Sequence, residues 1–145
     1  MATPVNPKCL AIIVCESVVE DIQTHNKCIW STFNQIAAPA FPAQHPKLVV
    51  FVTLTNGHGT VPFVLRFAQD TASKVLLELK GSIPFRNPLD IADMVFNLLL
   101  LPLPAPGPYS VQILTNGAVI GERRIQVVQA SVPGPGGPQP IGGQP

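Results

Sequence analysis

The sequence predicts an all-β fold in which antiparallel strands form a two-sheet sandwich of about seven or eight strands. Two Asn-Gly pairs, Asn56-Gly57 and Asn116-Gly117, each lie between runs of alternating apolar residues. Asn and Gly both adopt the positive φ angles that a two-residue hairpin turn requires, so each pair predicts a tight hairpin. The apolar runs are short and regularly spaced, and a single sheet of that size would leave one apolar face bare. We therefore expect two packed sheets, with a closed barrel as the alternative.

The first two apolar runs, Lys8–Glu16 and Lys27–Ile36, are separated by a polar stretch and predict the first strand pair. Ala37–Pro46 follows and contains three prolines. Proline removes a backbone donor and fixes φ, so this segment is expected to be an extended connection that crosses between the sheets.

Lys47–Thr55 leads into the first Asn-Gly pair and Thr60–Gln69 returns from it, which predicts a hairpin. Pro62 cannot donate to a strand ladder, so it suits an edge strand or a position near the start of its strand. Alternate residues of the returning strand are expected to face the core: Val61, Phe63, Leu65 and Phe67.

Lys74–Lys80 alternates and predicts a fifth strand, with Val75, Leu77 and Leu79 pointing inward. Leu89–Leu101 has the composition of a helix, but its apolar residues alternate and a helix here would be hydrophobic nearly all round, so we favour a strand. Tyr109–Leu114 and Ala118–Val128 complete the set around the second Asn-Gly pair.

The chain of 145 residues is 46% hydrophobic, which suits one domain that needs no disulfide or metal to fold. Residues 1–7 are expected to be an N-terminal extension and residues 8–130 the sandwich domain. Residues 131–145 consist mostly of Pro, Gly and Gln and are expected to be disordered, because they cannot bury enough apolar surface to fold.

Composition argues against several classes of partner. Charged residues make up 12% of the chain, the net charge is +1, and the nine Lys and Arg residues are scattered, so nucleic acid is not expected to bind. The longest apolar run, residues 98–106, is far shorter than the roughly 20 residues of a membrane span, and the N-terminus lacks the pattern of a signal peptide. The three cysteines, Cys9, Cys15 and Cys28, suit a reducing compartment and are expected to be buried. We expect a cytoplasmic protein with no cofactor and no membrane partner.

The segment Pro106-Gly107-Pro108-Tyr109-Ser110-Val111 resembles the entry into the penultimate strand of many immunoglobulin-like sandwiches. The resemblance implies that the Tyr109 hydroxyl bonds back to the preceding backbone. The cysteine that follows this tyrosine in antibody domains is replaced here by Val111, so only the architecture carries over.

The body of the chain is also similar to an uncharacterised family of small bacterial domains. The similarity rests on Val14-Cys15-Glu16 with Glu20-Asp21, Ala38–Pro46, Thr55–Gly59 and Gly121-Glu122-Arg123. It implies a single intracellular domain and supplies no catalytic residue.

Three constellations could carry chemistry, and each has a simpler structural interpretation. His25, His45 and His58 lie in predicted loops and would form a zinc site only if the fold brought them together, since their spacing matches no zinc motif. Cys15 would need a lowered thiol pKa to be a nucleophile, and an apolar strand raises it. The acidic residues that could bind calcium, but that also suit solvated loops, are Glu16, Glu20, Asp21 and Asp70.

Aromatic and aliphatic residues suggest a surface that binds protein. Trp30 and Phe33 are expected to pack in the core. Val49 and Phe51 occupy the opposite face of their strand from its core residues, and Val64 and Leu76 are expected to join them in one apolar patch. Such a patch indicates a protein partner or self-association, unless the Pro-rich connection or the tail covers it.

The sequence therefore predicts a non-catalytic protein-binding or assembly module. The alternative is a small-ligand, metal-binding or enzymatic domain that uses the loop residues Glu16, Glu20, Asp21, His25 and His58.

Overall fold

The computed structural model describes residues 5–130, in which nine strands form two sheets and no helix occurs. The expected tail from Ser131 onward and the first four residues of the expected N-terminal extension lie outside the described residues. The strands are β1 (Lys8–Glu20), β2 (Lys27–Thr32), β3 (Gln35–Ala38), β4 (Ala43–Thr55), β5 (Gly59–Gln69), β6 (Lys74–Phe85), β7 (Ile91–Leu103), β8 (Gly107–Thr115) and β9 (Ala118–Gln129).

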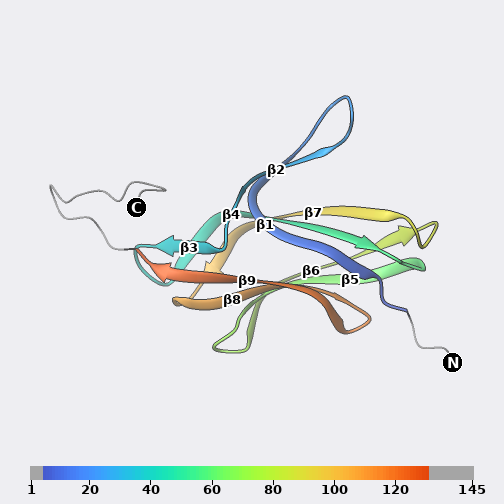
Figure 1. Ribbon diagram of the computed structural model, residues 1–145. Helices are drawn as coiled ribbons and strands as arrows, with labels where there is room; N and C mark the ends of the chain where they lie inside the picture. The colour runs from blue at the N-terminus through green and yellow to red at the C-terminus, as the bar shows by residue number, and fades with distance from the viewer. Residues whose placement is uncertain (1–4, 131–145) are drawn as a thin grey trace.

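The two sheets pack face to face and form the predicted sandwich (Figure 1). One sheet, here sheet A, has the strand order β2-β1-β4-β7, and the other, sheet B, has the order β3-β9-β8-β5-β6. All neighbouring strands are antiparallel except β3 and β9, which run parallel over residues 35–38 and 126–129. The prediction of an all-β sandwich is therefore confirmed.

The strand count of seven or eight is too low because the apolar run Lys27–Ile36 forms two strands. β2 pairs with β1, as predicted, but β3 belongs to sheet B. Ser31 has a positive φ of 54°, and the Phe33 amide bonds to the Val14 carbonyl at 3.2 Å, at the point where the chain leaves sheet A. Residues 39–42, which contain Pro39 and Pro42, then return the chain to β4 in sheet A, as expected. The expected connection Ala37–Pro46 is too long, because its first two residues belong to β3 and its last four to β4.

The first Asn-Gly pair does not make a hairpin, which corrects the sequence-based prediction. β4 pairs with β1 and β7, whereas β5 pairs with β6 and β8, so the chain changes sheets at Asn56-Gly57. Asn56 has a φ of 62°, and its amide donates to the Pro88 carbonyl at 2.9 Å instead of closing a ladder. A Cβ at Gly57 would lie 2.1 Å from the Phe85 ring, so glycine is required there for close approach.

The second Asn-Gly pair does make the predicted hairpin. Asn116 and Gly117 have φ angles of 50° and 78°, and Thr115 pairs with Ala118 across the turn. Asn6, from the segment before β1, accepts hydrogen bonds from the Asn116 amide at 2.9 Å and the Thr115 hydroxyl at 3.2 Å.

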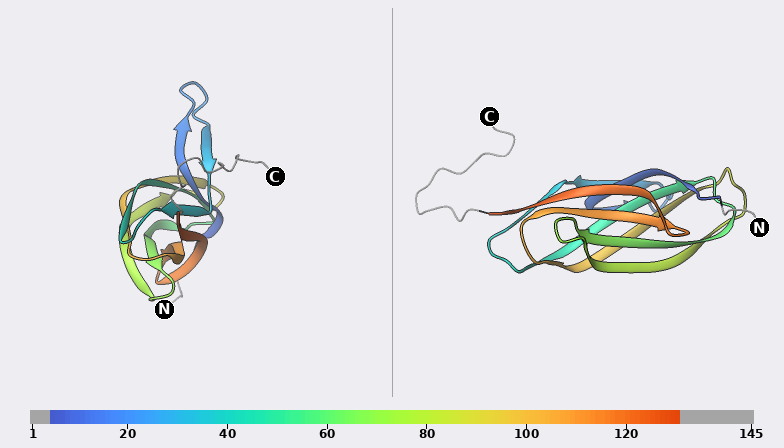
Figure 2. Two further views of the ribbon diagram at one scale, coloured as in Figure 1. Left: turned by 90° about the vertical axis from the view of Figure 1, so that its left-hand side faces the viewer. Right: turned by 90° about the horizontal axis from the view of Figure 1, so that it is seen from below.

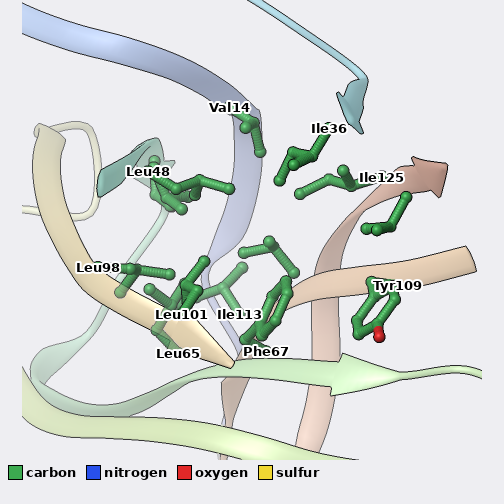
Figure 3. Packing of buried hydrophobic residues seen from close by; sticks show 14 of the residues in the cluster. Val14, Ile36, Leu48, Leu65, Phe67, Leu98, Leu101, Tyr109, Ile113 and Ile125 are labelled. Carbon is green, nitrogen blue, oxygen red and sulfur yellow. The ribbon is translucent and has the colours of Figure 1, made fainter. Parts of the chain in front are cut away.

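The core lies between the sheets and consists of aliphatic side chains and three buried aromatic residues, Phe67, Phe85 and Tyr109. Figure 3 shows part of this packing. Phe67 stacks on Tyr109 with ring centroids 5.5 Å apart and an interplanar angle of 14°. The Tyr109 hydroxyl donates to the Ala105 carbonyl at 2.6 Å and accepts from the Ala105 amide at 3.2 Å. The tyrosine corner expected from the immunoglobulin-like resemblance is thus present.

Local irregularities shift which residues of β6 and β7 face the core. Ile91–Leu103 is a strand, as predicted with the bounds Leu89–Leu101. Leu100 has a positive φ of 51° and points outward, while Leu101 is buried. In β6, a bulge places Leu76 opposite no residue of β5, so Val75 is exposed and Leu76 packs against the core. Strict alternation would instead place Leu100 and Val75 toward the core and Leu101 and Leu76 on the outside.

Candidate functional site

The four residues predicted to form one contact patch lie in three different places. Val49 and Phe51 occupy the outer face of sheet A, Val64 the outer face of sheet B, and Leu76 the β6 bulge beside the core. The prediction of one continuous patch is wrong because it treated β4 and β5 as neighbours in a hairpin. Whether any of these residues contacts a protein stays a prediction.

The outer face of sheet A is apolar in its central rows. The strand register aligns Phe51 with Ile13 on β1 and Val95 on β7, and it aligns Val49 with Cys15. Val49 is 1% exposed and Phe51 9%, so these two side chains form the floor of the face rather than its accessible part. The accessible apolar groups lie at the two sides of the sheet.

The first side is the edge strand β7. Ile91, Val95 and Leu99, at every fourth residue, point to the outer face and expose 64%, 37% and 63% of their surface. Leu100 is also exposed, because its positive φ turns the strand at that point. Asp93, whose carboxylate accepts a hydrogen bond from the Thr53 hydroxyl at 3.1 Å, is the charged residue of this strand.

The other side is the β1–β2 hairpin, whose distal part projects from the sandwich as an arm (Figures 1 and 2). Ile22, at the tip, is 89% exposed and Trp30, on β2, is 59% exposed. Trp30 was expected in the core, and this prediction is wrong because β2 pairs only with β1 and has no second sheet beneath it. An aromatic side chain and a β-branched one are therefore presented to solvent on a projecting ribbon.

The tip of the arm is held by the acidic residues that were considered as ligands. The Asp21 carboxylate accepts the Gln23 and Thr24 amides at 2.8 and 2.9 Å, and these bonds lower the pKa of Asp21. Glu20 accepts from His25 at 3.2 Å and from Lys27 at 3.0 Å, which lowers the pKa of Glu20. These carboxylates stabilise the turn through separate local partners, and they do not converge on one position where a ligand could bind.

The alternative site is not assembled. Glu20, Asp21 and His25 belong to the arm, whereas His58 lies in the crossing between β4 and β5. Figure 1 shows that this crossing is apart from the arm. Within residues 5–130 no group of three His, Cys, Asp or Glu side chains is placed to hold a metal ion. Asp70 instead accepts the Ser110 hydroxyl at 2.8 Å and pairs with Arg124 at 3.6 Å.

A hollow of about 550 Å³ lies at the base of the arm and contains His45 and Glu16. The His45 ring lies 6.0 Å from the Phe33 ring, centroid to centroid. Burial lowers the pKa of His45, and a hydrogen bond to the Lys47 backbone and the charge of Glu16 oppose that shift only in part. His45 is therefore a structural histidine that is favoured in its neutral form.

The outer face of sheet B is polar by comparison. Arg66 pairs with Glu78 at 3.2 Å, and Gln112 donates to Glu122 at 2.6 Å. Val64 lies there beside Leu114 in a shallow hollow of about 410 Å³, which Lys80 also lines. Arg66 and Lys80 thus lie beside Val64, although Pro62, Phe63 and Leu114 also line this hollow.

The cysteines occupy three different environments, and the expectation that all are buried is correct only for Cys15. Cys15 is fully buried and burial raises the pKa of its thiol, as expected of a structural cysteine. Cys9 is partly buried, with a pKa raised by the same cause, and Cys28 is exposed on the arm. The raised thiol pKa disfavours the thiolate that a nucleophilic Cys15 would need.

The model of a family of unknown function, DUF6941, matches residues 10–128. The chain belongs to DUF6941. Its membership confirms the expected kinship with an uncharacterised family. No curated protein matches the chain. Residues 5–130 contain no helix that is long and apolar enough to cross a membrane.

Several solved structures are similar to this DUF6941 chain. The Pseudomonas fluorescens alkylpurine DNA glycosylase AlkC, bound to DNA containing an abasic site analog, matches with a TM-score of 0.49 and 12% identity over 84% of this chain and 30% of that one. An immunoglobulin-like protein from Pseudomonas aeruginosa matches with a TM-score of 0.43 and 9% identity over 87% and 99% of the two chains. The CARDB domain of a Pyrococcus furiosus protein, in complex with di-metal ions, matches with a TM-score of 0.40 and 10% identity over 86% and 96%.

The lowered pKa of His45 should make the free energy of unfolding depend on pH. Its folded-state pKa lies below the unfolded value of about 6.5, so as the pH falls through that value the unfolded chain takes up a proton first. We expect the free energy of unfolding to decrease between about pH 7 and pH 5.5 more steeply in the natural chain than in His45→Gln. Urea unfolding across that range measures the effect. The exposed His58→Gln serves as the control, and parallel curves for the natural chain and His45→Gln would contradict the prediction.

Proposed function

We propose that this domain is a non-catalytic module that binds protein through sheet A. The observation that supports the proposal is the asymmetry between the two outer faces. Sheet A presents exposed apolar side chains on its arm and on β7, whereas sheet B presents ion-paired charged side chains. Exposed apolar groups that gather on one side of a weakly charged domain are typical of a protein contact.

The two sides of sheet A offer different kinds of contact. Trp30 and Ile22 project on the arm, where a large aromatic group can enter a pocket of a partner and act as an energetic anchor. The edge strand β7 offers a row of apolar side chains together with backbone groups that no strand within residues 5–130 pairs, which suits the addition of another strand. Between them, the buried Val49 and Phe51 give the face a rigid apolar floor.

Variants of the two sheets test the proposal. Trp30→Glu and Leu99→Lys alter exposed residues of sheet A, and Val75→Lys and Val119→Lys alter exposed residues of sheet B. All four sites are at least 44% exposed, so each variant is expected to fold, with an unchanged far-ultraviolet circular dichroism spectrum as the check.

The tagged full chain is retained on a resin and exposed to a lysate of its native host, and bound proteins are quantified by mass spectrometry. We expect the natural chain to capture one protein in a stoichiometric amount, either a host protein or an untagged copy of the chain. The captured amount should fall at least about tenfold with one or both sheet A variants and stay unchanged with both sheet B variants. Equal retention by all four variants, or loss from the sheet B variants alone, would overturn the proposal.

A further inference from the structure

We infer that the occupant of the β7 edge is a second copy of this chain, whose own β7 pairs with it antiparallel about a two-fold axis at Val95. This inference rests on the proposed function and specifies its partner. The two copies of sheet A would then form one continuous sheet across the interface.

The β7 edge differs from the other three sheet edges. It is 13 residues long, and from Met94 to Leu99 it carries no charge and no proline. The edge of sheet B on the same side, β6, carries Lys74, Glu78 and Lys80, which discourage the addition of a strand. The strands at the remaining edges, β2 and β3, are short, with six and four residues. Beyond them, β1 and β9 line a common hollow with residues 9–13 and 120–123. Within residues 5–130 no segment pairs with the free side of β7.

The side chains of β7 are complementary to themselves in one register. Directly opposed residues of antiparallel strands point to the same face, so a two-fold axis at Val95 sets residues with equal separation from Val95 against one another. On the outer face, Ile91 then meets Leu99 of the second copy and Asp93 meets Asn97, so an apolar group faces an apolar group and a carboxylate faces an amide donor.

On the inner face, the same register pairs Ala92 with Leu98 and Met94 with Phe96 of the second copy. All four side chains are partly or fully buried apolar residues that already contact the core. The register therefore continues the core side of sheet A as well as its outer side, and no like charges face each other.

Neighbouring registers lose this match. An axis at Phe96 sets Asp93 against Leu99 and Val95 against Asn97, and an axis at Asn97 sets Asp93 against Leu101, which is buried. Val95 is also the midpoint of Ile91–Leu99, the part of β7 that precedes the change of direction at Leu100. The geometry of the strand and its chemistry thus select the same axis.

Disulfide formation at the axis tests the inference. Residues on the axis face their own copies, and opposed residues in antiparallel strands have Cα atoms about 4.5–5.5 Å apart, within the range that a disulfide spans. Exposed Cys28 is first replaced by serine to remove its own cross-linking. Full-length Val95→Cys in this Cys28→Ser background is then oxidised with diamide and compared with Val75→Cys, since Val95 and Val75 are 37% and 44% exposed on neighbouring edges of the two sheets.

We expect Val95→Cys to give a covalent dimer on non-reducing electrophoresis at least about tenfold faster than Val75→Cys. Sedimentation velocity provides a second measurement: Val95→Lys sets two ammonium groups against each other at the axis and should raise the dimer dissociation constant at least about tenfold, whereas Val75→Lys should not. A natural chain that stays monomeric at all concentrations, or equal cross-linking by both cysteine variants, overturns the inference. In that case the loss of a host protein from the Trp30→Glu and Leu99→Lys variants would still support the proposed function.

Discussion

Replacing Phe67 with alanine should lower the free energy of unfolding by about 3–5 kcal/mol. Phe67 is 1% exposed, and its ring stacks on Tyr109 between the sheets. Truncation removes the apolar contacts of the ring and leaves a cavity beside the tyrosine corner. The cavity would lie where β5, which carries Phe67, pairs with β8, which carries Tyr109. Urea unfolding followed by circular dichroism measures the loss.

Phe67→Leu is the matched control, because it keeps most of the apolar volume and should cost less than half as much. A decrease below about 1 kcal/mol for Phe67→Ala would mean that the ring is not enclosed by both sheets, and the sandwich as described here would be wrong.

Replacing Gly57 with alanine should cost about 3 kcal/mol, the upper end of the range for overpacking a core. A methyl group at this position would lie 2.1 Å from Cδ1 of Phe85, whose ring is buried and cannot move away freely. Gly117→Ala meets no atom within 4 Å and is disfavoured only by its positive φ, so it should cost less. Thermal and urea unfolding of the two variants compare these effects.

The double variant Gly57→Ala with Phe85→Leu makes the prediction specific, because a smaller side chain at residue 85 gives the added methyl group room. Its loss of unfolding free energy should be smaller than the sum of the two single losses by about 1 kcal/mol or more. Additive losses would show that Gly57 does not lie against Phe85, and the crossing between the sheets would need another explanation.

The strands themselves could be predicted from the sequence because alternation is a property of each strand alone. Residues 91–103, for example, are a strand despite the helical composition of the predicted range Leu89–Leu101, and five alternating apolar positions indicated this. The Tyr109 corner was predictable for a similar reason, since the motif and its hydrogen-bond partner, Ala105, lie within a few residues.

Pairing between distant strands could not be predicted in the same way. Asn56-Gly57 has the composition of a hairpin turn, but its conformation is set by Pro88 and Phe85, which lie about 30 residues further along the chain. The exposure of Trp30 depends on what lies beneath β2, and this follows from the topology rather than from the local pattern. The candidate surface is therefore the arm and the β7 edge of sheet A, rather than the predicted patch that included Val64.

Hydrogen exchange measured by mass spectrometry on the assembled protein locates the protein contact that we assign to sheet A. Exchange of the associated form, either the concentrated chain or the chain with its captured partner, is compared with that of the dilute free chain. We expect slower exchange in one or both of the segments 17–32 and 89–100, with no change in segments 62–66 and 74–82 of sheet B. Slower exchange confined to the sheet B segments would contradict this assignment.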